Sequence, residues 1–206
     1  WNSGLSYKYL FNFLGNKSSI EASYFLTIFQ NQMILNAETP ELLKLEYIQD
    51  QSRAQSFQVE TDLQFTPNWS LRLSYKNDQT VANFDGEMKN IPLLKNDKYL
   101  ANLYYTASNQ KWKFSTTLLL NGSSRILSLT GRSENYSPFY PVLHAQINYL
   151  PNKKMDFNIG AENITSYNQS DRIYFANNVE NKSFDAGMIW GPMDLRRMYV
   201  GGKITF

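Results

Sequence analysis

The side chains that usually perform catalysis or hold metals are scarce in this chain. His144 is the only histidine, and there is no cysteine. A Ser-His-Asp triad would need His144 as its base, and no partners for it stand nearby in the sequence. Without cysteine, neither a thiolate metal site nor a disulfide framework can form. We therefore predict no catalytic site, no metal site and no cofactor, and we expect that the protein is not an enzyme.

The carboxylates lie in polar rows rather than in isolated pairs. Glu60 and Asp62 alternate with residues of the opposite character and share their side of the chain with Gln58 and Gln64. His144 likewise shares a side with amide residues. Carboxylates among amides are more typical of a hydrated wall than of a general acid–base pair. The pattern predicts a surface that faces water, not a reaction centre.

Two segments carry side chains suited to binding a ligand. Arg125, Arg132 and Tyr136 lie in segment 123–140, and Trp190 lies in segment 184–192. Arginine beside aromatic rings suits an anionic or aromatic chelate. The alternative for the arginines is a solvated loop, in which they pair with Glu134 or with phosphates of lipopolysaccharide. The alternative for Trp190 is packing within an extension of the last hairpin.

Strict alternation of apolar and polar side chains is the main pattern of the chain. Phe57, Val59 and Leu63 share one side of their segment, opposite Gln58 and Glu60. Period-two alternation of this length is typical of strands with one apolar and one wet face. We predict nine strands at 3–13, 19–31, 52–65, 69–78, 98–107, 112–121, 141–150, 155–163 and 195–206. One more strand could lie in segment 33–47, but its pattern is poor and interrupted by Pro40, so we assign none to it.

Short and long connections alternate along the chain. Short turns are expected at 14–18, 66–68, 108–111 and 151–154, and long loops at 32–51, 79–97, 123–140 and 167–182. Outer-membrane barrels have short periplasmic turns and long extracellular loops. Apolar-side aromatic residues collect beside the short turns, where a membrane-interface girdle would lie; they are Phe13, Phe65, Trp69, Trp112, Tyr149 and Phe206. Strands of about ten residues cross a bilayer, whereas sandwich strands are nearer five or six.

These features predict an all-β fold, a transmembrane antiparallel β-barrel. Composition agrees, because aromatic residues make up 15% of the 206 residues. The formal net charge of +2 argues against a nucleic-acid partner. The last strand should end at the short-turn side, in the periplasm, which places Trp1 at the extracellular side. Nine strands with termini on opposite sides do not close an even-numbered barrel, and the chain does not begin with Met. We therefore expect residues 1–206 to be the C-terminal portion of a larger barrel.

The sequence also resembles a known family, the TonB-dependent outer-membrane receptors. The resemblance is carried by 158–165 (NIGAENIT), 184–192 (FDAGMIWGP) and 197–206 (RMYVGGKITF), with weaker support from 24–32 (YFLTIFQNQ) and 90–94 (NIPLL). It implies a plugged barrel of about 22 strands, of which these would be the last nine. The plug and the TonB-contacting segment are absent from this sequence.

The resemblance implies active import of a scarce nutrient, such as a siderophore or another metal complex, with energy delivered through TonB. The implied partners are outer-membrane lipid and lipopolysaccharide, the TonB complex through the plug, the barrel-assembly machinery and a small-molecule or chelate substrate. A passive porin or structural barrel protein is the alternative, and a barrel hydrolase is a more distant one.

The last strand carries a further expectation. Tyr199, Gly201, Ile204 and Phe206 fit the pattern by which the assembly machinery recognises a terminal strand. Strand addition would supply the mechanism, because an exposed edge pairs through its backbone while alternate side chains give specificity. The alternative is that these residues simply face the lipid.

Overall fold

The computed structural model is built from antiparallel strands. It describes residues 1–36, 44–48, 52–84, 86–127, 136–169, 177–178, 180, 187 and 189–205. Within these ranges, no helix is long and apolar enough to cross a membrane. The strands are β1 (Asn2–Phe13), β2 (Asn16–Phe29), β3 (Gln32–Asn36), β4 (Lys44–Ile48), β5 (Ser52–Gln64), β6 (Trp69–Phe84), β7 (Glu87–Asn90), β8 (Asp97–Thr106), β9 (Trp112–Asn121), β10 (Tyr140–Asn152), β11 (Met155–Glu162) and β12 (Arg197–Ile204).

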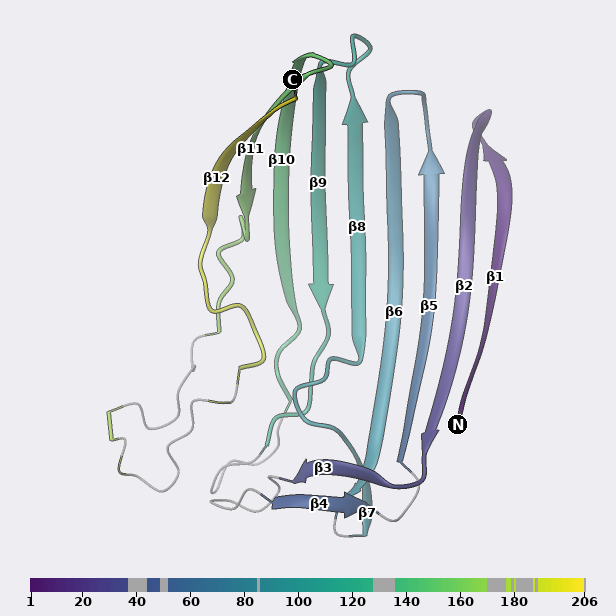
Figure 1. Ribbon diagram of the computed structural model, residues 1–206, viewed down its shortest axis with the longest axis vertical. Coiled ribbons are helices and arrows are strands. Elements are labelled where there is room, and N and C mark those ends of the chain that lie inside the picture. The colour runs from purple at the N-terminus through teal and green to yellow at the C-terminus, as the bar shows by residue number, and fades with distance from the viewer. Residues whose placement is uncertain are drawn as a thin grey trace.

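The main sheet is a meander in which each strand pairs with its neighbour along the path. Its order is β1-β2-β5-β6-β8-β9-β10-β11-β12, and β7 adds to β6 (Figure 1). β1 and β12 are not paired with each other, so the described strands form an open sheet. The all-β prediction and the nine main strands are confirmed, with most ends within two or three residues.

The short connections gather at one end of the sheet and the long ones at the other (Figure 1). The tightest turn joins Phe13 to Asn16, which are register partners. Its two central residues, Leu14 and Gly15, have φ angles of 49° and 80°. Two positive φ values define the type I′ turn, whose twist matches that of the flanking strands. Glycine meets this requirement without strain, which explains why Gly15 is a useful turn signal.

The sequence prediction was wrong in two of the long connections. Segment 33–47 was expected to contain no strand, yet β3 and β4 form a two-stranded sheet there. The strand predicted to end at 78 continues to Phe84 as β6 and turns back through β7. The reason is tertiary packing, because Ile34 and Ile48 of the hairpin bury Ala82 and Phe84 of the β6 extension. Such contacts are invisible to a local pattern.

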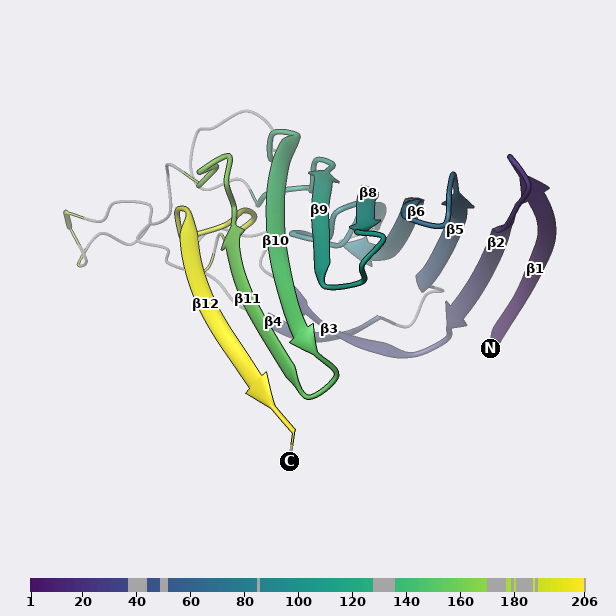
Figure 2. The same cartoon turned by 90° about the horizontal axis from the view of Figure 1, so that it is seen from above.

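The sheet is curved, and its two faces differ in character. Figure 2 shows it as an arc, with β3 and β4 on the concave side. We call the concave side the inner face and the convex side the outer face. Glu60 and Arg72 lie on the inner face, whereas Leu73 and Phe114 lie on the outer face, where they are 42% and 38% exposed. The predicted division into polar and apolar faces is therefore present.

Aromatic rings form two rows on the outer face. At the short-turn end, Trp69 contacts Tyr105 with ring centroids 4.5 Å apart, and Trp112 contacts Tyr149 at 4.5 Å. Farther along the strands, Tyr75 stacks on Tyr99 at 4.8 Å. Phe57 meets Tyr75 in the same upper row at 6.4 Å. The first row matches the predicted girdle; Phe206 lies outside the described residues. The upper row was not predicted.

Candidate functional site

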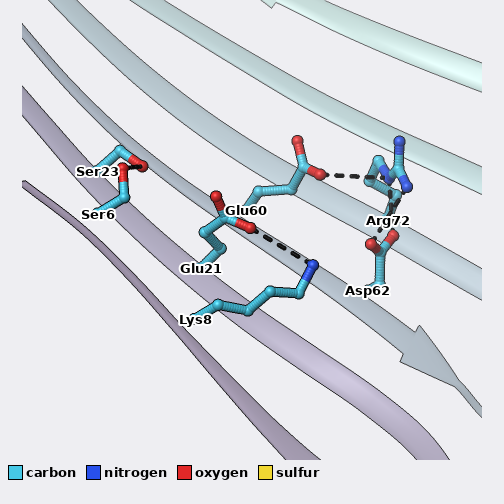
Figure 3. A network of polar contacts seen from close by, with 7 residues as sticks. All are labelled: Ser6, Lys8, Glu21, Ser23, Glu60, Asp62 and Arg72. Atoms are coloured by element: carbon cyan, nitrogen blue, oxygen red, sulfur yellow. Dashed lines mark hydrogen bonds and ion pairs between the residues drawn. The ribbon is translucent and has the colours of Figure 1, made fainter.

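The inner face carries two separate sets of ion pairs, one between β1 and β2 and the other between β5 and β6 (Figure 3). Lys8 Nζ lies 3.5 Å from Glu21 Oε2. Arg72 Nε donates to Asp62 Oδ1 at 2.7 Å and lies 3.7 Å from Glu60 Oε1. Strand register explains the grouping, because these side chains occupy neighbouring positions on one face. Glu21, Glu60 and Asp62 of the predicted hydrated wall are thus each paired with a basic side chain.

His144 also lies on this wall, opposite Thr117 in the register of β9 and β10. In the described part of the chain, no three His, Asp or Glu side chains come together in a group that could hold a metal ion.

Arg125 is placed beneath the loops rather than at their tips. Its Nε donates to the backbone oxygen of Asn90 at 2.7 Å. Its guanidinium lies 5.6 Å from the ring centroid of Phe84, and its backbone oxygen accepts from Leu93 N at 2.8 Å. Arg125 therefore ties segment 91–96 to the end of β6. These contacts give Arg125 a structural role; its role as a substrate contact stays a prediction, and Glu134 lies outside the described residues.

The other predicted loop contacts are Tyr136, Arg132 and Trp190. Tyr136 forms a backbone bridge with Arg125, and its ring is exposed. Arg132 lies outside the described residues. Trp190 joins an aromatic cluster at the start of β10. Whether these residues contact a substrate stays a prediction.

The aromatic cluster consists of Tyr140, Tyr167 and Trp190. Tyr140 and Tyr167 stack with centroids 4.7 Å apart and planes 6° apart. Trp190 lies 5.9 Å from Tyr140. The buried Gln169 fixes this arrangement, because its Oε1 accepts from the backbone nitrogens of Trp190 at 2.9 Å and Gly191 at 3.2 Å. The packing alternative for Trp190 is the one the described contacts favour.

Lys95 connects segment 91–96 to the aromatic cluster. Its Nζ lies 4.4 Å from the centroid of the Tyr140 ring and donates to Tyr140 Oη. Tyr140 Oη in turn donates to the backbone oxygen of Trp190 at 3.3 Å. Burial, reinforced by the charge of Lys98, lowers the pKa of Lys95 to about 8. A partly buried cation is thus held against the ring of Tyr140, at a cost in solvation.

Lys95 also lines a groove on the inner face, which we call the lysine groove. Its volume is about 290 Å³, and its side chains include Phe25, Thr27, Asp78, Thr80, Lys95 and Lys98. Asp78 accepts from Ser56 Oγ at 2.7 Å and pairs with Lys76 Nζ at 3.0 Å. Its distance to Lys98 Nζ is 3.9 Å. Sequence reasoning missed this groove; its only signal was the neighbouring segment 90–94, which carries part of the family resemblance.

Asn163 organises the segment after β11. It is 6% exposed and has a φ of 47°. Its Nδ2 donates to the backbone oxygens of Tyr167 at 2.7 Å and Asp194 at 2.9 Å, and its Oδ1 accepts from Tyr167 N at 3.2 Å. Asparagine tolerates this left-handed conformation better than most residues. This gives a physical reason for asparagine in the NIGAENIT stretch.

The four proposed assembly-signal residues do not share a face. Tyr199 is on the inner face, where its ring covers Gly160 and its Oη donates to Gln146 Oε1 at 2.6 Å. Gly201 lies opposite Asn158 on the same face. Ile204 is on the outer face, and Phe206 lies outside the described residues. The alternative that all four face the lipid is wrong for Tyr199, because odd and even positions of a strand point to opposite sides.

Solved structures share this fold over the full length of the chain. The ferric-catecholate import receptor Fiu from Escherichia coli K12 is 16% identical with a TM-score of 0.63, over 100% of this chain and 28% of the receptor. The copper transporter OprC is 14% identical with a TM-score of 0.70, over 100% of this chain and 31% of the transporter. The FrpB iron transporter from Neisseria meningitidis is 11% identical with a TM-score of 0.65, over 100% and 31%. No family model and no curated protein matches the chain.

These matches establish the fold at low sequence identity. The chain has the fold of part of the transmembrane β-barrel of TonB-dependent outer-membrane receptors. It spans less than one third of the length of the three proteins named above. The resemblance noted in the sequence is thereby confirmed as a resemblance of fold.

Proposed function

We propose that the chain forms neighbouring strands, the last nine, in the barrel of a TonB-dependent importer in a bacterial outer membrane. The observation that carries this proposal is the contrast between the two faces of one curved sheet. The outer face is apolar and bears two aromatic rows, and the inner face is ion-paired and wet. A soluble protein would have to cover that outer face, whereas lipid covers it in a membrane.

The cargo we propose is a metal ion or its chelate. Receptors of the same fold are named for ferric catecholate, copper and iron. The barrel would provide the wall of the import path, and its loop end would face the medium. The short turns and the C-terminus would then face the periplasm. In this function the protein binds and moves its cargo without changing it chemically.

Uptake measurements in matched bacterial strains test the proposal. Cells carrying the whole receptor are compared with cells that lack it and with cells that lack TonB, using radioactive iron or copper supplied as chelates. We expect uptake of one cargo to require both the receptor and TonB. Uptake that needs the receptor and is unaffected by loss of TonB would establish the passive porin instead.

A further inference from the structure

The lysine groove has an excess of positive charge at the loop end of the inner face. Lys95 and Lys98 line it with a single carboxylate, Asp78. Asp78 is already satisfied by Ser56 and by Lys76, which also places a third lysine at the edge of the groove. Thr27 and Thr80 also line the groove, and the hydroxyl of Thr27 donates to Asn2 Oδ1 at 3.4 Å. A ligand that enters here meets two lysines and one carboxylate that is already paired.

The two lysines differ in how firmly they are held. Lys98 is half exposed and lies 3.9 Å from Asp78 Oδ2, which is a loose ion pair. Lys95 is bound to Tyr140 by both its ring and its hydroxyl. Lys95 therefore lines the lysine groove while its ammonium group is bound at the aromatic cluster, so an anion in the groove would compete with Tyr140 for that group.

We propose that the lysine groove is a subsite for a compact polyanionic group of the ligand, and that binding there draws Lys95 away from Tyr140 and loosens the aromatic cluster. The inference rests on the proposed function, because it assigns a chemical class to the ligand that the importer would take. Carboxylate, phosphate and catecholate groups all have the necessary acceptor oxygens and negative charge.

The groove favours a compact anion for physical reasons. Lysine ammonium groups act as point charges with three donors each, so they suit clustered oxygens. Phe25 and Leu94 make part of the lining apolar. An anion held between that apolar lining and two ammonium groups is partly shielded from water, which strengthens its attraction to the cations. The volume of about 290 Å³ accommodates a small polyanionic group rather than an extended polymer.

Loosening of the cluster would reach three segments. Lys95 holds segment 91–96 against Tyr140, the first residue of β10. The hydroxyl of Tyr140 holds the backbone of Trp190, and its ring stacks on Tyr167. When Lys95 turns toward a bound anion, Tyr140 loses a cationic partner on its ring and on its hydroxyl oxygen. The ligand thus gains a direct effect on loop contacts that it does not touch.

The first test measures anion binding to the purified whole receptor. The probe is inorganic pyrophosphate, and its binding is measured by titration calorimetry at pH 7. We expect saturable binding that weakens about tenfold in Lys95→Met and in Lys98→Met, the scale of one lost charge-assisted hydrogen bond. Lys113→Met is the matched control, because Lys113 is also on the inner face but opposite Asn148, toward the short-turn end. Absence of saturable binding, or equal affinity in all variants, overturns the proposal.

A second test separates sharing of Lys95 from mere support of the fold. Tyr140→Phe removes the hydroxyl that competes for Lys95 and keeps the ring. If the lysine is shared, pyrophosphate should bind about fivefold more tightly to this variant, since one competing hydrogen bond is gone. A purely structural role for Tyr140 predicts unchanged or weaker binding. That result would refute the sharing, even if the lysine variants had failed to fold.

The pH dependence supplies a third readout. With a pKa of about 8, Lys95 loses its charge as the pH rises from 7 to 9. Asp78, Lys98, Tyr140 and Tyr167 are the other titratable groups around it, and Lys98 favours the same loss through repulsion. Pyrophosphate itself gains negative charge over this range, so the readout is the comparison of two proteins. The affinity of the wild type should fall relative to that of Lys95→Met as the pH rises. An equal change in both proteins would contradict a role for Lys95.

These binding results are independent of transport. Lysine-dependent pyrophosphate binding in a receptor that imports nothing through TonB would keep the subsite and refute the proposed function. TonB-dependent uptake by a receptor whose Lys95 and Lys98 variants bind pyrophosphate normally would support the proposed function and refute the subsite.

Discussion

An arginine placed at Leu73 tests whether the outer face contacts lipid. Leu73 lies on β6 between Trp69 of one aromatic row and Tyr75 of the other. Its register partners are Thr61 and Ala101, neither of which can pair with a guanidinium charge. Arginine at the mid-plane of a barrel's lipid face costs about 2–4 kcal/mol. From position 73 the side chain can reach toward the Tyr75 row, about 6.6 Å along the strand, so we expect the lower end, about 2 kcal/mol.

The matched control is Ser74→Arg, one residue farther along β6. Ser74 is on the inner face and lies opposite Glu60 in the register of β5 and β6. An arginine there has a carboxylate neighbour and water, so its effect on the free energy of unfolding should be close to zero. Moving the same charge by one residue therefore separates the two faces within one strand.

The assay is denaturant titration of the whole receptor folded into lipid vesicles. A difference of about 2 kcal/mol corresponds to a roughly 30-fold change in the folding equilibrium. We expect a lower urea midpoint for Leu73→Arg and an unchanged midpoint for Ser74→Arg. Equal midpoints for the two variants would show that the outer face does not meet hydrocarbon, and the reasoning about faces would fail.

Three further predictions concern the C-terminal strands. Gly160→Ala should lower stability by about 1–3 kcal/mol, since a methyl group there overlaps the ring of Tyr199; in a Tyr199→Ser background the same change should cost much less in a denaturant titration. Asn163→Ala should open segment 164–195 to proteases, since it removes four hydrogen bonds, and Asn163→Gly should be milder because glycine accepts the positive φ. Phe206→Ala and Ile204→Asn should reduce the amount of receptor at the cell surface without changing substrate affinity, and normal abundance with weakened binding would contradict an assembly role.

The regular part of the fold was predictable because its strands, each with one apolar and one polar face, repeat one physical rule. In β5 and β9 the polar or apolar character of each residue matches the face on which it lies. The alternation of polar and apolar residues therefore predicts both the strand and its two faces. Residues that favour tight turns predicted the short connections, as Leu14 and Gly15 illustrate. The strand predicted at 112–121 coincides with β9 from end to end.

The loop end was harder to predict because it is built from distant contacts. Arg125 was selected for its charge and surroundings in the sequence, but its partner Asn90 is supplied by another loop. Lys95 has no distinctive local pattern, and it acquires its role only when Tyr140 and Trp190 arrive from elsewhere. Tyr199 was counted with Ile204 as one signal, although alternation along β12 alone separates them.

The nearest-neighbour pairing of the sheet has an evolutionary consequence. Each main strand exchanges hydrogen bonds only with the strands on either side, so the sheet resembles a linear array of hairpins. A change in one loop then leaves the strand register intact, even where it alters contacts with another loop such as those of Arg125 and Lys95. Strand pairing can therefore persist while the sequence diverges. This fits the TM-scores of 0.63–0.70 at identities of only 11–16% between this chain and the receptors compared above.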